Sequence, residues 1–397
     1  MPGCAQPFPL VAASLCILFH SAQAQLQQPP IDPVSYLALQ AKGPTYAVAD
    51  VWQQHQHIPN WQEVHRVTAD TWDVLPKAYD PAFKNPCWKV DQPDGRSILK
   101  CLPYFQVLGV SKCGTTDLYH RLARHNDVVE CAWKGPHFFD ETRYPSHMKP
   151  NRNGYDGTFQ AYVNLYDRMA LSIAQDPAVR ITGEASSNTY TGVLAFVRGP
   201  TIAKRTNATL AQYLKEATPF ARFIVLCRDP VDRYHSAYHY YRHNWTSTPE
   251  ALEEFHRRAE ADIMHWENCL ARQSEARCLA QYSPQQLIKG MYAAFLPYWL
   301  SEFPRDQMLF IRTEDYKAAP QEHVQASLDF LGVRSQVGIG TARPPGSGPT
   351  RLTDVQNQKK YNPMLPKTRH LLEGFYRPFN QKMAELNGND PRWLWGY

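Results

Sequence analysis

The chain lacks the features that mark several broad classes of protein. Its 397 residues contain no internal repeat and no low-complexity tract, which argues against a solenoid or a disordered chain. No spacing of Cys and His matches a zinc site, and His55-Gln-His57 is more typical of a solvated loop than of a ligand pair. The formal net charge of +5 is too small to indicate nucleic acid as a partner. Hydrophobic residues make up 43% of the chain, enough for one globular domain with a sizeable core.

The N-terminus has no apolar run long enough to cross a bilayer. Residues 10–19 are largely apolar, but a transmembrane helix needs about 20 such residues. The small residues of Ala22-Gln-Ala24 follow, as at a signal-peptide cleavage site, although no Lys or Arg precedes Lys42. We therefore expect a signal peptide at 1–24, a stem or wrapping segment at 25–100, and the main domain at 101–397. The protein would then be luminal or secreted, with no transmembrane helix after cleavage; a retained anchor is the alternative.

The cysteines indicate an oxidising compartment. Cys87 and Cys101 flank a polar loop that contains Gly, and Cys269 and Cys278 bracket a short charged segment. Pairs this close in sequence predict two local disulfides.

Three further cysteines and two sequons complete this pattern. We expect Cys113 and Cys227 to be free packing residues, and the pairing of Cys131 stays open. Asn207-Ala-Thr209 and Asn244-Trp-Thr246 are glycosylation acceptors by pattern. Both observations favour the secretory pathway.

The stretch from Tyr104 to Tyr119 carries the strongest functional pattern. An apolar run gives way to a short loop bounded by Gly and then to a helical pattern, which predicts a strand, an anion-binding loop and a helix. At the positive end of the helix dipole, four residues would present backbone N–H groups: Cys113, Gly114, Thr115 and Thr116. Lys112 and the two threonine hydroxyls add donors, so we expect a phosphate-like ligand. This is not a standard nucleotide-triphosphatase loop, because its lysine precedes the second glycine.

A second strand-to-helix transition lies at residues 222–236. Pro230 suits the first turn of a helix, Arg228 stands at the expected strand end, and Ser236 follows two turns into the helix. The planar fork of Arg can give two charge-assisted hydrogen bonds to one phosphate. Either transition alone is a weak signal, but the two in this order favour phosphate binding.

Together the two loops resemble the cofactor site of the sulfotransferases. A lysine inside the first loop can reach the bridging oxygen of a 5′-phosphosulfate, where negative charge develops as the sulfuryl group leaves. Four further blocks are similar to those of the Golgi carbohydrate sulfotransferases: 134–139, 182–187, 309–315 and 374–380. The resemblance runs from about residue 100 to the C-terminus. It is greatest to the branch that 6-O-sulfates N-acetylgalactosamine 4-sulfate in chondroitin and dermatan sulfate.

The resemblance implies a cofactor and an acceptor. The cofactor would be 3′-phosphoadenosine 5′-phosphosulfate (PAPS), with Arg228 and Ser236 on its 3′-phosphate and no metal required. Residues 343–363 are rich in Pro and Gly and then basic, and resemble the family loop that closes over the cofactor. Lys359 or Lys360 would contact phosphate from this loop. The acceptor would be an acidic polysaccharide, and the oligomeric state stays open.

The chain departs from this family at the expected base. Where relatives carry Lys-Glu-Pro-His, it has Lys134-Gly-Pro-His137, so the usual carboxylate is missing. His137 is the nearest candidate, with an unperturbed pKa of about 6.5; a structural histidine bonded to a backbone carbonyl is the alternative. Glu184, at an expected strand end, is a second candidate, although a carboxylate there more often caps a helix or orients a cofactor.

Three functions stay open on these residues. In the first, the chain is an active carbohydrate sulfotransferase that has rearranged its base. In the second, it binds the nucleotide or a sulfated glycan without efficient transfer. We favour activity because Lys112, Arg228 and Ser236 are present and a base contributes only about 10²–10⁴-fold. Sulfation of protein tyrosines is the third, but the blocks outside the cofactor site match the carbohydrate branch better.

Strands alternate with helices along the main domain. We predict strands at 104–110, 180–184, 222–227 and 307–312, and helices at 115–125, 159–174, 230–243, 250–270, 285–302, 321–331 and 366–387. This alternation predicts an α/β fold with a doubly wound, mostly parallel sheet and helices on both faces, as in the P-loop-like sulfotransferase fold. Both anion loops then lie at the carboxyl ends of strands, where such sheets bind ligands.

Overall fold

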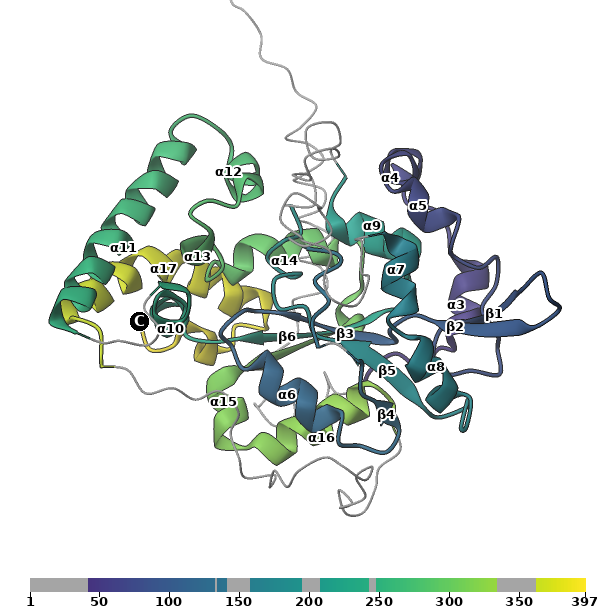
Figure 1. Cartoon of the computed structure of the whole chain (residues 1–397). Helices are drawn as coiled ribbons and strands as arrows, with labels where there is room; N and C mark the ends of the chain where they lie inside the picture. The colour runs from purple at the N-terminus through teal and green to yellow at the C-terminus, as the bar shows by residue number, and fades with distance from the viewer. Residues whose placement is uncertain (1–41, 133, 141–157, 195–207, 243–247, 334–361) are drawn as a thin grey trace, which may run out of the picture.

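A five-stranded sheet runs through the centre of the protein (Figure 1). The computed structural model describes residues 42–132, 134–140, 158–194, 208–242, 248–333 and 362–397. The strand order is β4 (Val128–Val129), β5 (Ile181–Glu184), β3 (Phe105–Gly109), β6 (Arg222–Cys227) and β7 (Met308–Arg312). All four neighbouring pairs are parallel. The four strands predicted from sequence are confirmed, and β4 is an addition. Every residue of β3 and β6 is buried, as expected for strands covered on both faces.

Helices cover both faces of this sheet, which confirms the predicted fold class (Figure 1). One face carries α6 (Thr115–Leu122), α15 (Thr313–Ala318) and α16 (Pro320–Phe330). The other face carries α7 (Phe159–Asn164), α9 (Leu210–Ala217) and α14 (Tyr292–Leu300). The strand order places β5 and β6 on opposite sides of β3, so the direction of winding reverses at β3. Doubly wound sheets bind ligands at this reversal, beyond the carboxyl ends of the strands.

A further group of helices lies beyond the end of β6 (Figure 1). It comprises α10 (Pro230–Arg242), α11 (Pro249–Leu270), α12 (Glu275–Gln281), α13 (Gln285–Ile288) and α17 (Pro366–Leu386). The disulfide Cys269–Cys278 joins the end of α11 to α12, as predicted. Two short 3-10 helices, Arg305–Gln307 and Pro391–Leu394, precede β7 and follow α17.

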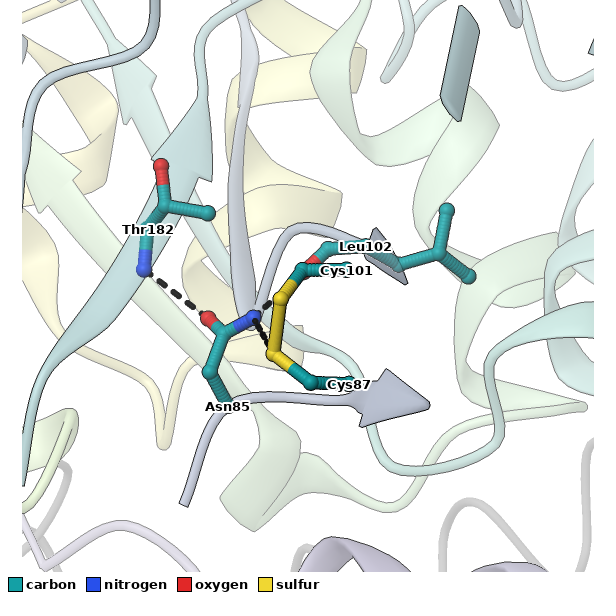
Figure 2. Close-up of a disulfide and its surroundings, with 5 residues drawn as sticks. All are labelled: Asn85, Cys87, Cys101, Leu102 and Thr182. Atoms are coloured by element: carbon teal, nitrogen blue, oxygen red, sulfur yellow. Dashed lines mark hydrogen bonds between the residues drawn. A yellow bond between two sulfur atoms is a disulfide. The ribbon is translucent and has the colours of Figure 1, made fainter. Parts of the chain in front are cut away.

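The N-terminal part of the described chain packs on the domain with its own small elements. These are α3 (Val48–Gln54), α4 (Trp61–Val67), α5 (Ala69–Trp72), α8 (Asp167–Ile173) beside them, and the antiparallel hairpin of β1 (Cys87–Asp91) and β2 (Ser97–Cys101). The predicted disulfide Cys87–Cys101 closes the hairpin. Figure 2 shows how Asn85 anchors it: the amide Nδ2 donates to the carbonyl of Leu102 (2.9 Å), and Oδ1 accepts from the N–H of Thr182 in β5 (2.9 Å). One buried amide therefore joins the hairpin to the central sheet.

Two predicted helices are interrupted. Residues 159–174 form α7 and α8 with a break at Leu165–Tyr166, and residues 285–302 form α13 and α14 with a break around Gly290. At the second break, a Cβ on Gly290 would lie 2.8 Å from the ring of Tyr376, so close packing against α17 requires glycine at this position. The helix pattern could not reveal this contact, because Tyr376 lies in α17.

Some sequence predictions lie outside the described residues. They are the signal peptide at 1–24, the sequon asparagines Asn207 and Asn244, and the loop lysines Lys359 and Lys360. Within the described ranges, no helix combines the length and the apolar character that a membrane crossing needs.

Candidate active site

The loop between β3 and α6 turns sharply at the N-terminus of the helix. Lys112 (φ +73°) and Gly114 (φ +93°) are in the left-handed region, which reverses the chain so that α6 begins at Thr115. The first N–H groups of a helix have no acceptor within it, and they lie at the positive end of its dipole. The N–H of Cys113, however, donates to the carbonyl of Val110 (3.1 Å). In this conformation that amide closes the turn and does not point to an anion, unlike the prediction.

A hydroxyl joins this loop to the end of β6. Oγ1 of the buried Thr313 lies 2.7 Å from the carbonyl of Cys113 and 3.0 Å from the carbonyl of Cys227. The phenol of Tyr292 donates to the carbonyl of Arg228 (2.8 Å) and lies 3.7 Å from the thiol of Cys113. Sequence analysis missed both residues, because each acts on backbone far away in the chain. The two predicted anion loops are therefore held in one rigid arrangement.

Two side chains of the first loop contact tyrosines of α10. Nζ of Lys112 lies 3.8 Å from the ring centroid of Tyr240, a cation–π contact. The hydroxyl of Ser111 lies 3.2 Å from that of Tyr241. Both tyrosines are exposed for about half of their surface, 52% each. The lysine predicted to face the cofactor is thus held at the protein surface by an aromatic side chain that the sequence did not single out.

Two cations, Arg228 and Lys317, lie at the end of β6 near the carboxylates of Asp232 and Glu314. The side chain of Arg228 is only 17% exposed, and its Nη2 lies 3.9 Å from Oδ2 of Asp232. Burial and the charge of Arg228 together lower the pKa of Lys317, so these two cations lie in one electrostatic environment. Ser236 lies two turns into α10 and is buried. The sequence predicted Arg228 and Ser236 for this end of the sheet but not Lys317.

The cysteines near the loops are packing residues. Cys113 and Cys227 are free and buried, as predicted, and Cys131 is buried as well. Burial raises the pKa of the Cys113 thiol, so it is not an activated nucleophile.

A polar cluster lies at the carboxyl end of β5, next to the first loop. Nδ1 of His137 lies 2.8 Å from Oδ2 and 3.0 Å from Oδ1 of Asp140, whose side chain is 1% exposed. The backbone N–H of His137 donates to Oγ of Ser186 (2.8 Å), and Ser186 donates through its hydroxyl (2.5 Å) and its N–H (2.9 Å) to Oε2 of Glu184. The two candidate bases named from sequence are therefore brought together through one serine.

The charges of this cluster are strongly coupled. Burial lowers the pKa of His137, but the charge and hydrogen bond of Asp140 outweigh it, so the pKa is raised above 6.5. Burial raises the pKa of Glu184 to about 7 and lowers that of Lys134 to about 8. Oε1 of Glu184 is buried, with no hydrogen-bond partner among the described residues. Buried groups that titrate near neutral pH are typical of proton-transfer sites.

The imidazole of His137 is oriented for proton acceptance. A carboxylate on Nδ1 holds the proton of the neutral ring at that atom and leaves Nε2 as the acceptor. The predicted alternative was a histidine bonded to a backbone carbonyl, whereas the described partner of Nδ1 is Asp140. Sequence reasoning missed Asp140, although a carboxylate three residues after a histidine was a visible signal.

The backbone at Gly135 disfavours a glutamate at this position, where the related enzymes carry one. Its φ of +75° is strained for any side chain, and a Cβ there would lie 3.0 Å from the carbonyl oxygen of Ala185 and 3.5 Å from Nε2 of His137. The basic nitrogen of His137 thus borders the place where a side chain of residue 135 would begin.

Comparisons with known proteins identify the family of this chain. The family model of the sulfotransferase domain matches residues 103–364. Carbohydrate sulfotransferase 15 from Homo sapiens is 30% identical over 395 residues, covering 83% of this chain and 68% of that protein; the Mus musculus protein is 27% identical with the same coverage. Bifunctional heparan sulfate N-deacetylase/N-sulfotransferase 4 from Mus musculus is 25% identical over 345 residues, covering 83% of this chain and 35% of that protein. Since the family model spans the central sheet and both strand-end loops, the chain belongs to the sulfotransferase family, as its sequence predicted.

Proposed function

We propose that this sulfotransferase uses PAPS to sulfate a hydroxyl group of a glycosaminoglycan, with the 6-hydroxyl of N-acetylgalactosamine in chondroitin or dermatan sulfate as the favoured acceptor. The observation that carries the proposal is the pair of anion loops at the ends of β3 and β6, joined by Thr313. The names of the relatives, carbohydrate sulfotransferase 15 among them, support a glycan acceptor. The disulfides and the expected signal peptide are consistent with a protein of the Golgi lumen or a secreted one.

The residues around the two loops fit a nucleotide with two phosphate groups. The N-terminus of α6, with the Thr115 and Thr116 hydroxyls and Lys112, would hold the 5′-phosphosulfate. Arg228 and Ser236 would hold the 3′-phosphate, with Lys359 or Lys360 as further contacts from the sequence resemblance. PAPS supplies the sulfuryl group when bound, and no metal is required for the step. Lys112 would stabilise the negative charge that develops on the leaving phosphate, provided that it moves from the ring of Tyr240.

The His137–Asp140 pair would remove the proton of the acceptor hydroxyl. In the neutral ring Nδ1–H donates to Asp140, so Nε2 is the basic atom that would accept a proton as the hydroxyl oxygen attacks sulfur. Asp140 would stabilise the imidazolium that forms. Glu184 is the alternative base, because its Oε1 is buried and its pKa lies near 7.

A binding function without efficient transfer is the second candidate, and Gly135 is the observation that favours it. A transfer assay with sulfur-labelled PAPS separates the two. We expect label to enter chondroitin 4-sulfate or dermatan sulfate. After digestion of the polysaccharide, the label should be recovered in the 6-O-sulfated disaccharide. Label on heparan precursors alone would change the acceptor, and label on tyrosine peptides alone would favour the third function. Binding of the nucleotide without transfer to any acceptor would refute activity.

A further inference from the structure

A histidine cluster far from the anion loops surrounds one buried carboxylate. Nε2 of His55 lies 3.2 Å from Oε2 of Glu216, Nδ1 of His57 lies 2.9 Å from the same oxygen, and Nε2 of His65 lies 4.0 Å from it. The Glu216 side chain is only 1% exposed. Sequence analysis predicted a solvated loop at His55-Gln-His57, which is wrong for His55, because its side chain is 9% exposed.

The four residues come from three parts of the chain. His55 follows α3, His57 lies in the segment between α3 and α4, and His65 lies in the last turn of α4. Glu216 lies in the last turn of α9, more than 150 residues away in sequence. No short spacing motif could reveal such a set, which is why the sequence showed no zinc pattern.

Hydrogen bonding accounts for only part of this arrangement. Nε2 of His65 is buried and has no hydrogen-bond partner in the described part of the chain. Its ring stacks face to face on Trp72, with centroids 3.7 Å apart, so it is fixed in place. A buried nitrogen 4.0 Å from the Glu216 carboxylate, with no hydrogen bond in the described ranges, calls for a further partner.

The geometry suits a metal ion. The donor atoms of His55, His57 and Glu216 all lie within 4.8 Å of one another. Around a tetrahedral zinc with bonds of about 2.0–2.1 Å, donor atoms lie roughly 3.4 Å apart, close to the distances from the two nearer histidines to Oε2. Oε1 of Glu216 accepts the N–H of Ile58 (2.9 Å), the kind of outer bond that orients a metal ligand.

We propose that His55, His57 and Glu216 bind one Zn²⁺ ion, with the stacked ring of His65 beside the site. Two imidazoles and one carboxylate form a donor set that favours zinc over calcium or magnesium. The ion would tie the segment between α3 and α4 to α9. The site shares no residue with the anion loops or the His137 cluster, and therefore stands independently of the proposed function.

Metal content and cobalt spectroscopy test the site on the full-length protein. We expect about one zinc per chain after purification in zinc-containing buffer, and a lower melting temperature after chelation that zinc restores. Cobalt added to the chelated protein should give the intense visible absorption of a tetrahedral site, which zinc then displaces. Calcium and magnesium should restore nothing. A wild-type protein without a cobalt band, or one stabilised equally by calcium, would overturn the proposal.

Matched variants assign the ligands. His57→Gln changes a half-exposed side chain and should leave the fold intact. It should lower the affinity for zinc at least 10- to 100-fold, since even the loss of a residue that hydrogen-bonds to a ligand has that effect. Glu216→Gln should act likewise, with His57→Gln decisive if the buried change impairs folding. His120→Gln is the control, because His120 forms an isolated pair with Glu130 (3.0 Å). Equal zinc affinity in His57→Gln and the control would show that the cluster is only hydrogen-bonded.

Discussion

Nδ1 of His137 lies 2.8 Å from the buried carboxylate of Asp140, so the imidazole is both oriented and made more basic. The raised pKa has a direct kinetic consequence, because only the neutral ring can accept a proton. Transfer by the wild-type protein should therefore increase with pH through a titration above 6.5, the ordinary value for histidine.

Asp140→Asn tests the role of this carboxylate. The change removes the charge that raises the pKa of His137, so the rising limb of kcat/KM should move to lower pH while the maximal rate falls by about 10²–10⁴-fold. His137→Gln should abolish the limb altogether. A limb that stays in place in both variants would assign the base to Glu184. Gly135→Glu is a poor test of a restored carboxylate, because φ at that position is +75°.

Glu184 should make folding stability depend on pH. Its folded pKa of about 7 lies above the ordinary value of 4.5, so the folded state binds more protons between these values and stability falls as pH rises through that window. Glu184→Gln should remove this decrease, which we expect to be on the order of 3 kcal/mol. Urea unfolding of both proteins at several pH values measures it. Parallel curves for the two proteins would contradict the raised pKa.

Lys112 should matter more in the transition state than in the ground state. Lys112→Ala is expected to lower kcat more than it weakens binding of 3′-phosphoadenosine 5′-phosphate, because charge on the leaving phosphate develops only as the bond breaks. Tyr240→Phe keeps the ring under the lysine and serves as the matched control. An increase in KM with unchanged kcat would make Lys112 a binding residue only.

Arg228 should supply affinity for the nucleotide. Arg228→Ala removes a charge-assisted contact. In calorimetry, binding of 3′-phosphoadenosine 5′-phosphate should become weaker by roughly 1.5–3 kcal/mol, or about 10- to 150-fold in affinity. Arg66→Ala is the control, since Arg66 pairs with Glu63 in the N-terminal segment. ATP should raise the melting temperature much less than the bisphosphate does. Equal stabilisation by the two nucleotides would contradict a separate 3′-phosphate site.

Thr313→Val should loosen both anion loops at once. The change keeps the shape of the side chain but leaves the carbonyls of Cys113 and Cys227 without their hydroxyl donor. We expect a loss of about 1–3 kcal/mol in unfolding free energy, together with weaker nucleotide binding. Thr313→Ser keeps the donor and should preserve most of both quantities. Wild-type affinity in Thr313→Val would show that the loops hold their positions independently.

The sequence predicted those features of the fold that residues close together in the chain encode. The apolar runs of β3 and β6, the long helices α11 and α17 and both disulfides were visible because each is encoded by neighbouring residues. The two residues of β4 are too few to show a period. The close packing at Gly290 and the bonds of Thr313 depend on partners elsewhere in the chain, as does the convergence of three histidines on Glu216.

The link that Thr313 makes between the two loops fixes the distance between them. The pairing of β3 with β6, the bond from the N–H of Val110 to the carbonyl of Leu226 (2.8 Å) and the threonine hydroxyl together fix the spacing of the loops before any nucleotide arrives. We therefore expect the site to select a ligand by the separation of its phosphates as well as by their number. Adenosine 2′,5′-bisphosphate carries the same charge, but its second phosphate is on a neighbouring carbon. It should therefore bind more weakly, because the loop spacing suits a different separation of the two phosphates.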